Sequence, residues 1–486
     1  MNDLFSLAYL GFFAAAALLN YLLPRVVRPY FLLAANYAFY CYAPENRPLA
    51  AVLAGATLVT WLCGLIIGKC RVKAVRVLFL LLALAGGVGI LLYYKYWNLL
   101  ADAVTGLTGA RMAHLDLLTP LGLSYFTFAA LSYTIDVFRK RCRVEPNLLH
   151  YAMFVSFFPT MITGPIERYP HLRPQIKNPR RFSYSRCAGG LFRILWGYMK
   201  KMVIADNLAQ YVSLVFAAPE TMGGPHLAVA SLLFAVQLYM DFSGCCDIAL
   251  GVARILGYDL IENFRAPFEA TSFSELWNRW HISMTSWFRD YIYFPMGGSR
   301  CNLVRRSLNV IIVFTVSGLW HGAEWQYLLW GLICGVISAV GRATLPARKV
   351  LWRHNPLYRA AWLQTLIQRC VTVLLFAFAM SCFACALYGA DPFGVYAGML
   401  QGWQGLAPAW QSVTALIHDS GIDGRMPVVL TCAVVIVFLA ESHGRNVARW
   451  IRQQNFVLRW TLYYAAGAAI LFFGAFGQSA FIYQQF

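Results

Sequence analysis

Residues 316–330 read VSGLWHGAEWQYLLW, and this stretch decides how the rest of the chain is interpreted. One ionisable base, His321, lies there between two strongly apolar arms, residues 308–319 and 325–340. Gly318 and Gly322 flank the histidine, which allows the backbone to turn sharply or to pack closely. An imidazole at membrane depth is costly, so a histidine in this setting is a candidate functional residue. The alternative is a structural histidine that is hydrogen-bonded in a polar seam.

The composition is that of an integral membrane protein, with 59% hydrophobic and only 13% charged residues. The net charge of +19 comes from short basic clusters between apolar runs, which is typical of cytoplasmic loops and gives no reason to expect nucleic acid as a partner. The thirteen cysteines are scattered and lack zinc-type spacing, so we expect neither a metal site nor a disulfide framework. The single C-x-x-C pair, Cys382 and Cys385, lies in an apolar run and indicates packing.

Apolar runs near the ~20 residues that cross a bilayer recur along the chain. If the basic clusters between them are all cytoplasmic, the spans alternate and leave both termini outside. This holds only if residues 151–164 and the two arms around His321 each enter and leave on the cytoplasmic side. Such backbone must be buried in protein or line a watery cavity, so we predict a cytoplasm-entered cavity near His321. Besides the His321 hairpin, the candidate spans are residues 4–23, 31–43, 49–67, 77–96, 120–138, 189–216, 227–256, 371–388, 428–439 and 461–476.

Polar residues in apolar surroundings supply further candidates. Asp241 and Ser243 share one span, whereas Asn263 and His281 lie in a stretch rich in Trp, Tyr and Arg that is typical of interfacial helices. Each also has a structural interpretation, because polar side chains hold membrane helices together. A histidine in a buried tunnel favours general-base activation of a hydroxyl, and water-poor surroundings would protect a thioester donor that Asn263 or His281 could orient. A transporter would use the same residues as a proton relay.

Long motifs resemble the membrane-bound O-acyltransferase family, and more narrowly its bacterial alginate and peptidoglycan O-acetyltransferase branch. Residues 262–298 (ENFRAPFEATSFSELWNRWHISMTSWFRDYIYFPMGG) contain His281 within W-x-x-W-H, and residues 318–325 (GLWHGAEW) contain His321. The resemblance extends over nearly the whole chain. Relatives usually have FSGYSD where this chain has FSGCCD. The other matching stretches are residues 237–257 (QLYMDFSGCCDIALGVARILG), 120–139 (PLGLSYFTFAALSYTIDVFR) and 154–176 (FVSFFPTMITGPIERYPHLRPQI).

The resemblance implies an all-α polytopic membrane protein, in which a ring of tilted transmembrane helices with re-entrant and interfacial helices surrounds a central tunnel. We expect a single integral-membrane acyltransferase domain over residues 1–486. His321 would be the catalytic base and His281 the second catalytic histidine. The residues expected to line the tunnel or contact substrate are Asp241, Ser243, Asn263, Trp280 and Trp320. The expected parts are N-terminal helices (1–140), a catalytic core with re-entrant segments (141–345), C-terminal helices (346–480) and an extracytoplasmic aromatic tail (481–486).

The implied reaction takes acetyl from cytosolic acetyl-CoA, a substrate rather than a bound cofactor, and passes it across the bacterial inner membrane. A periplasmic SGNH or esterase-like partner would then place it on an exported polysaccharide such as peptidoglycan or alginate. Tyr483 in the aromatic tail would carry the acyl group in transit, or else would be an interfacial anchor. The alternatives are D-alanyl transfer from a carrier protein to teichoic acid, and a proton-coupled transporter or flippase.

Overall fold

A computed structural model describes residues 6–354, 360–420, 422–444 and 447–476, and these residues form helices and connecting turns without a strand. The prediction of an all-α protein is therefore confirmed. The chain divides into two compact units. Unit 1 comprises the chain up to Ile194 together with Ile248–Ile261, and unit 2 comprises Leu195–Asp247 together with the chain from Glu262 onward.

Seven helical segments in the described part of the chain are long and apolar enough to cross a membrane. The protein is thus a multi-pass membrane protein, as the apolar runs predict. These segments are Pro44–Lys69, Lys73–Lys95, Gly224–Ile255, Leu303–His321, Trp325–Ala343, Ala361–Tyr388 and Phe456–Phe473.

Several predicted spans differ from the helices that form. Four of them become helices of 13 to 16 residues. At about 1.5 Å per residue these helices are shorter than the ~30 Å hydrocarbon core. The predicted span at residues 189–216 is interrupted, because α10 (Tyr184–Tyr198) runs through a π-helical segment, η2 (Met199–Ala205), into α11 (Asp206–Ala217). The interruption contains the two buried lysines described below. The four short helices are α1 (Leu7–Leu22), α2 (Arg28–Tyr40), α6 (Leu123–Phe138) and α21 (Met426–Glu441).

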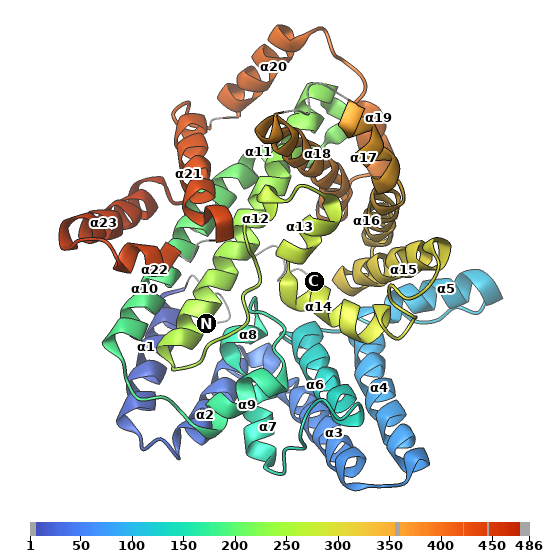
Figure 1. The fold of residues 1–486 in the computed structure, drawn as a ribbon, viewed down its shortest axis with the longest axis vertical. Helices are drawn as coiled ribbons and strands as arrows, with labels where there is room; N and C mark the ends of the chain where they lie inside the picture. Colours follow the sequence, from blue (N-terminus) through green and yellow to red (C-terminus); the bar gives the residue numbers. More distant parts are fainter. Residues whose placement is uncertain (1–5, 355–359, 421, 445–446, 477–486) are drawn as a thin grey trace. The chain divides into compact units, whose positions relative to one another are not determined.

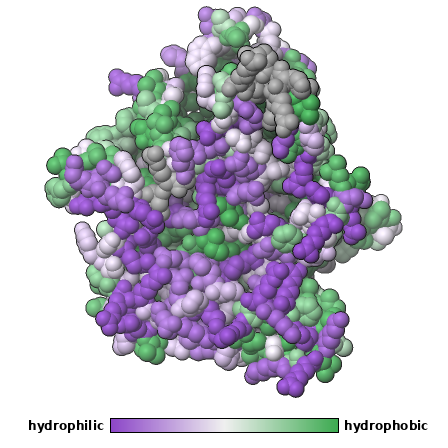
Figure 2. All heavy atoms as spheres, in the orientation of Figure 1, coloured by the Kyte–Doolittle hydropathy of each residue, from purple (hydrophilic) through white to green (hydrophobic). Residues whose placement is uncertain are grey.

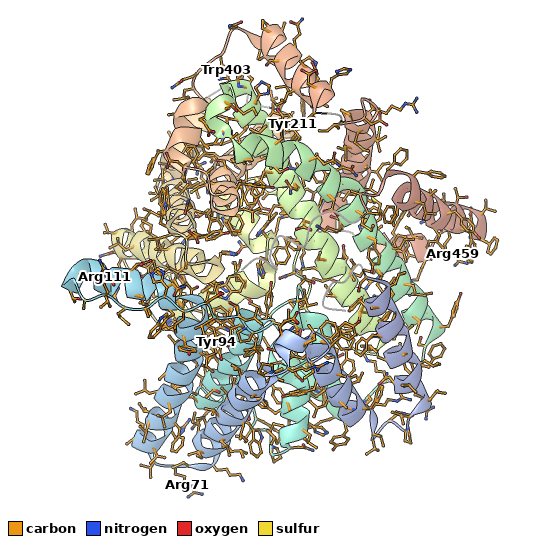
Figure 3. The ribbon with its side chains drawn as sticks, turned by 180° about the vertical axis from the view of Figure 1, so that it is seen from behind. Arg71, Tyr94, Arg111, Tyr211, Trp403 and Arg459 are labelled. Carbon is orange, nitrogen blue, oxygen red and sulfur yellow. The ribbon has the colours of Figure 1, made fainter. Side chains whose placement is uncertain are left out.

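Unit 1 is built around three apolar helices that lie side by side: α3 (Ala50–Lys69), α4 (Lys73–Lys95) and α6 (Figure 1). Arg71 precedes α4 and Tyr94 lies near its other end, so a cation and an amphipathic ring mark the two ends of this span (Figure 3). Basic and tyrosine residues at span ends are typical of membrane boundaries.

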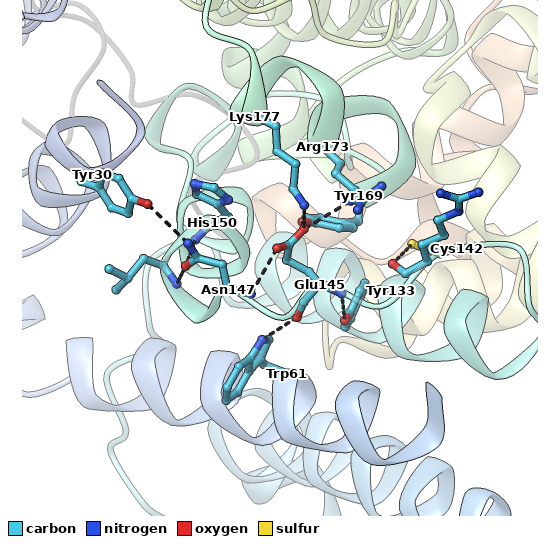
Figure 4. Close-up of polar contacts among 12 residues, drawn as sticks. Tyr30, Trp61, Tyr133, Cys142, Glu145, Asn147, His150, Tyr169, Arg173 and Lys177 are labelled. Carbon is cyan, nitrogen blue, oxygen red and sulfur yellow. Dashed lines mark hydrogen bonds and ion pairs between the residues drawn. The ribbon is translucent and has the colours of Figure 1, made fainter. Parts of the chain in front are cut away.

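In unit 1, the chain around the predicted re-entrant segment folds back on itself. It forms α7 (Leu148–Val155), α8 (Phe158–Met161) and α9 (Tyr169–Lys177). Glu145, just before α7, accepts a hydrogen bond from the Tyr169 hydroxyl at 2.7 Å and forms an ion pair with Lys177 at 2.8 Å (Figure 4). Both partners lie in α9, so Glu145 ties the start of α7 to α9, and entry and return at one membrane face stay a prediction. Hydrophilic side chains gather over α9 on the face drawn in Figure 2.

Unit 2 carries the candidate site on a helical hairpin of α15 (Leu303–His321) and α16 (Trp325–Ala343), which pack along each other (Figure 1). A Cβ atom on Gly318 would lie 2.2 Å from the Tyr327 carbonyl oxygen, and one on Gly331 would lie 2.4 Å from the Phe314 carbonyl oxygen. The missing side chains therefore let the two backbones approach closely, as in many membrane helix pairs. This confirms the close packing predicted for Gly318.

Unit 2 contains further helices besides this hairpin. They include the first part of α12 (Gly224–Ile255), η4 (Pro267–Glu269), α13 (Phe273–Arg279), α14 (Ile282–Phe288), η5 (Arg289–Tyr293), α17 (Leu345–His354), α18 (Ala361–Tyr388), α19 (Pro392–Gly398), α20 (Leu406–Asp419), α22 (Val447–Arg452) and α23 (Phe456–Phe473). Of these, α13, α17 and α18 contact α16.

Candidate functional site

His321 is the last residue of α15, and it is buried among aromatic rings. Its ring centroid lies 5.0 Å from that of Trp330 on α16 and 5.2 Å from that of Phe383 on α18, both in edge-on geometry. The α15–α16 hairpin therefore fixes the histidine from two sides, and α18 closes a third. A rotamer that is locked by packing in this way keeps a catalytic group in one orientation.

His281 lies between α13 and α14 and is fully buried. Its backbone is left-handed, with φ 43° and ψ 52°. A residue other than glycine pays about 1–3 kcal/mol for such a conformation, which persists only when the surroundings enforce it and which is concentrated at functional sites. The backbone at His281 is therefore held by its neighbours rather than by its own preference.

Asn263 orients His281 from an unstructured segment between α12 and η4. Its Oδ1 atom accepts hydrogen bonds from the Ser283 backbone N–H at 3.0 Å and from the Ser283 hydroxyl at 2.9 Å, and it lies 3.3 Å from Nδ1 of His281. Because an amide oxygen only accepts, Nδ1 of His281 carries the proton in this contact, and Nε2 holds the lone pair. The clamp thus selects one tautomer of the imidazole.

Both histidines contact the Trp320 indole. The ring centroid of Trp320 is 6.0 Å from that of His281 and 4.9 Å from that of His321. His281 lies outside the seven candidate spans, and its burial lowers the pKa of the imidazole to about 3. It is therefore neutral at physiological pH and able to accept a proton or a hydrogen bond rather than to provide a fixed positive charge.

A cavity of about 160 Å³ lies between the helices that flank His281 and the hairpin that carries His321, and neither histidine lines it. Trp277 lines it, and the ring of Trp277 lies 6.0 Å from that of Trp330, which in turn packs against His321. Ser317 lines it one helical turn before His321. The cavity is further lined by Thr285, Arg289, Ser338 and Arg342. Its lining therefore contains aromatic rings, hydroxyl groups and two guanidinium groups.

The remaining predicted site residues take different positions. Trp280 is buried in an aromatic cage next to His281, and Ser243 is buried in α12. Asp241 is held in an ion pair, because Nζ of Lys201 lies 2.9 Å from its Oδ1 atom. None of these three lines the cavity described above. Tyr483 lies outside the described residues.

Sequence reasoning missed a buried ionic cluster of Lys200 and Lys201. Nζ of Lys200 lies 2.5 Å from Asp247 and 3.0 Å from Glu441, and Nζ of Lys201 lies 2.7 Å from Asp206. With Asp241, four carboxylates therefore surround two ammonium groups. Two adjacent lysines inside an apolar run are the signal that marks this cluster in the sequence, since intramembrane charges are rare without a partner and a reason.

Within the described residues, no group of three or more His, Cys, Asp or Glu side chains is arranged to hold a metal ion. All thirteen cysteines are free. Cys382 and Cys385 are buried in α18, and the Cys382 thiol contacts the Gln326 carbonyl oxygen at 3.3 Å. These cysteines therefore pack α18 against the start of α16.

Comparison with known proteins agrees with this arrangement. Residues 90–388, which include both histidines, match the model of the membrane-bound O-acyltransferase family. The chain is 36% identical to a probable alginate O-acetylase of Pseudomonas putida, over 67% of each protein. It is 31% identical to a peptidoglycan O-acetyltransferase of Helicobacter pylori, over 69% of this chain and 68% of that protein.

A teichoic acid D-alanyltransferase of Bacillus subtilis is more distant, at 26% identity over 57% of this chain and 70% of that protein. The alignments with the two O-acetylating proteins thus span about two thirds of each chain. On these grounds, the chain belongs to the membrane-bound O-acyltransferase family.

Proposed function

We propose that this protein transfers an acetyl group from cytosolic acetyl-CoA across the bacterial inner membrane for O-acetylation of an exported polysaccharide. The observation that carries the proposal is the pair of buried histidines that both contact Trp320, with a cavity between the helices that flank His281 and the hairpin that carries His321. Relatives that are named for O-acetylation of alginate and of peptidoglycan support the class of reaction.

The cavity has the chemistry that an acetyl-CoA donor requires. Arg289 and Arg342 can pair with its phosphates, because a guanidinium group matches phosphate oxygens with two parallel hydrogen bonds. Trp277 and the hydroxyl groups of Ser317 and Ser338 suit the less polar arm that ends in the thioester. Bound in this direction, the thioester would approach the histidine pair past Trp330.

In the proposed reaction, His321 is the general base. Its neutral imidazole takes the proton of the acceptor hydroxyl while the hydroxyl oxygen attacks the thioester carbonyl carbon. The carbon–oxygen bond forms, the carbon–sulfur bond breaks, and the proton passes to the departing thiolate. His281, fixed by Asn263, would hydrogen-bond the donor or the acceptor in the same step. The surrounding rings exclude water, which would otherwise hydrolyse the thioester.

The outward half of the pathway is proposed from the family resemblance. Tyr483 would receive the acetyl group as an ester and hand it to a periplasmic SGNH or esterase-like partner, with both chain termini on the outer side of the membrane. Replacing Tyr483 with Phe is then expected to abolish acetylation of the polysaccharide in cells while acetyl-CoA binding remains. Undiminished acetylation would show that Tyr483 is an anchor instead.

The test of the proposal uses the purified protein in lipid nanodiscs with acetyl-CoA that carries a labelled acetyl group. We expect release of free CoA thiol and transfer of label to acceptor, both lost in His321→Ala and retained in His418→Ala, which changes an exposed histidine on α20. Turnover of a D-alanyl carrier protein instead of acetyl-CoA would favour teichoic acid modification. Movement of substrate without thioester cleavage would favour a proton-coupled transporter or flippase.

A further inference from the structure

Trp280, the residue that precedes His281, is held in an aromatic cage within unit 2. Its ring centroid lies 4.8 Å from that of Phe376, 5.2 Å from that of Phe264 and 5.9 Å from that of Tyr239. Trp280 and His281 are both buried. Since His281 adopts a left-handed conformation that its own preference opposes, the cage on Trp280 is one of the contacts that enforce it.

One wall of this cage is fixed from a distant part of the chain. The Tyr239 hydroxyl donates a hydrogen bond of 2.5 Å to Oε2 of Glu441, the last residue of α21. The Tyr239 ring is itself buried and also contacts Phe268 and Phe438. The phenol thus has its ring on Trp280 and its oxygen on a carboxylate.

Glu441 is anchored on its other oxygen. Oε1 accepts hydrogen bonds from Nζ of Lys200 and from Nε1 of Trp196, each at 3.0 Å. Lys200 is in turn bound by Asp247 at 2.5 Å. The carboxylate is therefore fully engaged between an ammonium group, an indole and a phenol, and charge-assisted hydrogen bonds of this kind are the stronger ones in proteins.

A second bond from the same helix end reaches the segment that leads to His281. The backbone N–H of His443 donates to the carboxylate of Glu269 at 3.0 and 3.1 Å, and Glu269 ends η4, shortly before α13. Glu269 also faces Arg279, two residues before His281, at 3.8 Å. The end of α21 thus contacts the catalytic segment through Tyr239 and through Glu269.

We propose that Glu441 is a positioning residue for His281, acting through Tyr239 and Trp280. The proposal rests on the proposed function, since it concerns the geometry of the same histidine. Glu441 touches neither histidine directly; its carboxylate holds the phenol, the phenol ring holds Trp280, and Trp280 keeps the neighbouring backbone left-handed. A displacement of about 1 Å at a catalytic group lowers a rate by up to a hundredfold, so loosening this chain is expected to reduce turnover without removing any catalytic atom.

The experiment is a double-mutant cycle in nanodiscs with Tyr239→Phe, Glu441→Gln and the combined variant. Tyr239→Phe keeps the ring and removes only the hydroxyl that meets Glu441. We expect each single change to lower kcat about tenfold or more while KM for acetyl-CoA stays within about twofold. The double variant should be no slower than the slower single variant, because residues in one hydrogen-bonded network are not additive. Glu441→Asp, which retains the charge, should recover part of kcat.

Glu145→Gln is the matched control, because Glu145 is also a carboxylate bonded to a tyrosine hydroxyl and a lysine, but in unit 1. It should lower the thermal midpoint and leave kcat unchanged. Wild-type kcat in folded Tyr239→Phe and Glu441→Gln, or multiplicative losses in the double variant, would overturn the positioning role. Absence of turnover in the wild type, or full turnover in His281→Ala, would instead contradict the proposed function itself.

Discussion

Glu145 in unit 1 and Glu441 in unit 2 have the same kinds of polar partner but differ in where those partners lie in the sequence. Glu145 is buried and Glu441 is partly exposed, and each carboxylate accepts a hydrogen bond from a tyrosine hydroxyl and pairs with a lysine. Neither charge would be tolerated at that depth without such partners. The partners of Glu145 follow it by 24 to 32 residues, whereas those of Glu441 lie more than 200 residues away in the sequence.

The difference lies in what the tyrosine ring touches next. The ring of Tyr169 packs among Tyr133, Tyr151 and Phe154, so the carboxylate closes the re-entrant segment into one core. The ring of Tyr239 packs on Trp280, beside a histidine in a costly backbone conformation. The two carboxylates are therefore expected to differ in role, structural for Glu145 and positioning for Glu441, and measurements of stability and rate on the same variants separate the two roles.

The largest expected effect is on the base itself. His321→Ala should lower acetyl transfer by about 10²–10⁴-fold, the range that general-base catalysis contributes. The thermal midpoint in detergent should change little, since Trp330 and Phe383 keep their edge-on contact beside the shortened side chain. His418→Ala, with its exposed ring, is the control. A His321→Ala protein with normal turnover and a lowered thermal midpoint would show that His321 has a structural role, as Glu145 is expected to have.

Glu145→Gln should have the opposite profile, with a loss of about 3 kcal/mol of unfolding free energy and an unchanged rate. Burial by itself raises the pKa of the Glu145 carboxyl, but Lys177, Tyr169 and Arg173 outweigh burial, so the pKa lies below its usual value. A carboxyl with a lowered pKa stabilises the folded state above the unfolded pKa, about 4.3, and this contribution disappears as the pH falls through the folded value.

The pH dependence supplies the check on Glu145. The difference in thermal midpoint between wild type and Glu145→Gln should be full at pH 7 and should shrink below about pH 4. A difference that does not change with pH would mean that the amide fails through shape and not through charge. Any loss of rate in the folded variant would remove the contrast with Glu441.

Gly331→Ala addresses the hairpin that carries His321 and should affect both stability and rate. Its new Cβ would meet the Phe314 carbonyl oxygen at 2.4 Å, so the two helices must separate. Overpacking of this kind costs about 1–3 kcal/mol. Gly341→Ala in the same helix is the matched control, because nothing lies within 4 Å of its new Cβ. Equal thermal midpoints for the two variants would show that the close approach is not needed.

How far the sequence predicts this molecule depends on how far apart the interacting residues lie. Apolar run length predicts an all-α membrane protein, and the placement of basic clusters predicts that residues 151–164 turn back. The motifs around His281 and His321 make both histidines and Asn263 candidate site residues, because these residues lie on long continuous stretches. Periodicity does not predict how long the shorter helices are, because these helices end where polar side chains and turns begin.

The ionic cluster shows why the remainder escapes prediction. Lys200 is adjacent in sequence to none of its partners, and Glu441 lies 241 residues away from it. A carboxylate at the end of an apolar helix, read alone, indicates only a boundary with water. Asp241 illustrates the same limit, since its position in a span suggests a tunnel wall, but Lys201 from another helix binds it. Ion pairs between distant segments depend on packing, which a single sequence does not record.

The smallest expected effect tests the clamp that sets the tautomer of His281. Ser283→Ala removes one of the two hydrogen bonds that Ser283 donates to Oδ1 of Asn263 and leaves the other, from the backbone, in place. A net hydrogen bond contributes about 1 kcal/mol, so kcat should fall roughly fivefold. Ser286→Ala on the same helix is the control, since its hydroxyl bonds to the Ser283 carbonyl oxygen in the helix.

If Ser283→Ala and Tyr239→Phe both slow turnover and their effects multiply, Asn263 and Glu441 hold His281 independently, one through its ring nitrogen and one through its backbone. If the two effects overlap, the clamp and the aromatic cage are one cooperative unit, and the contrast between Glu145 and Glu441 extends to the whole surroundings of His281.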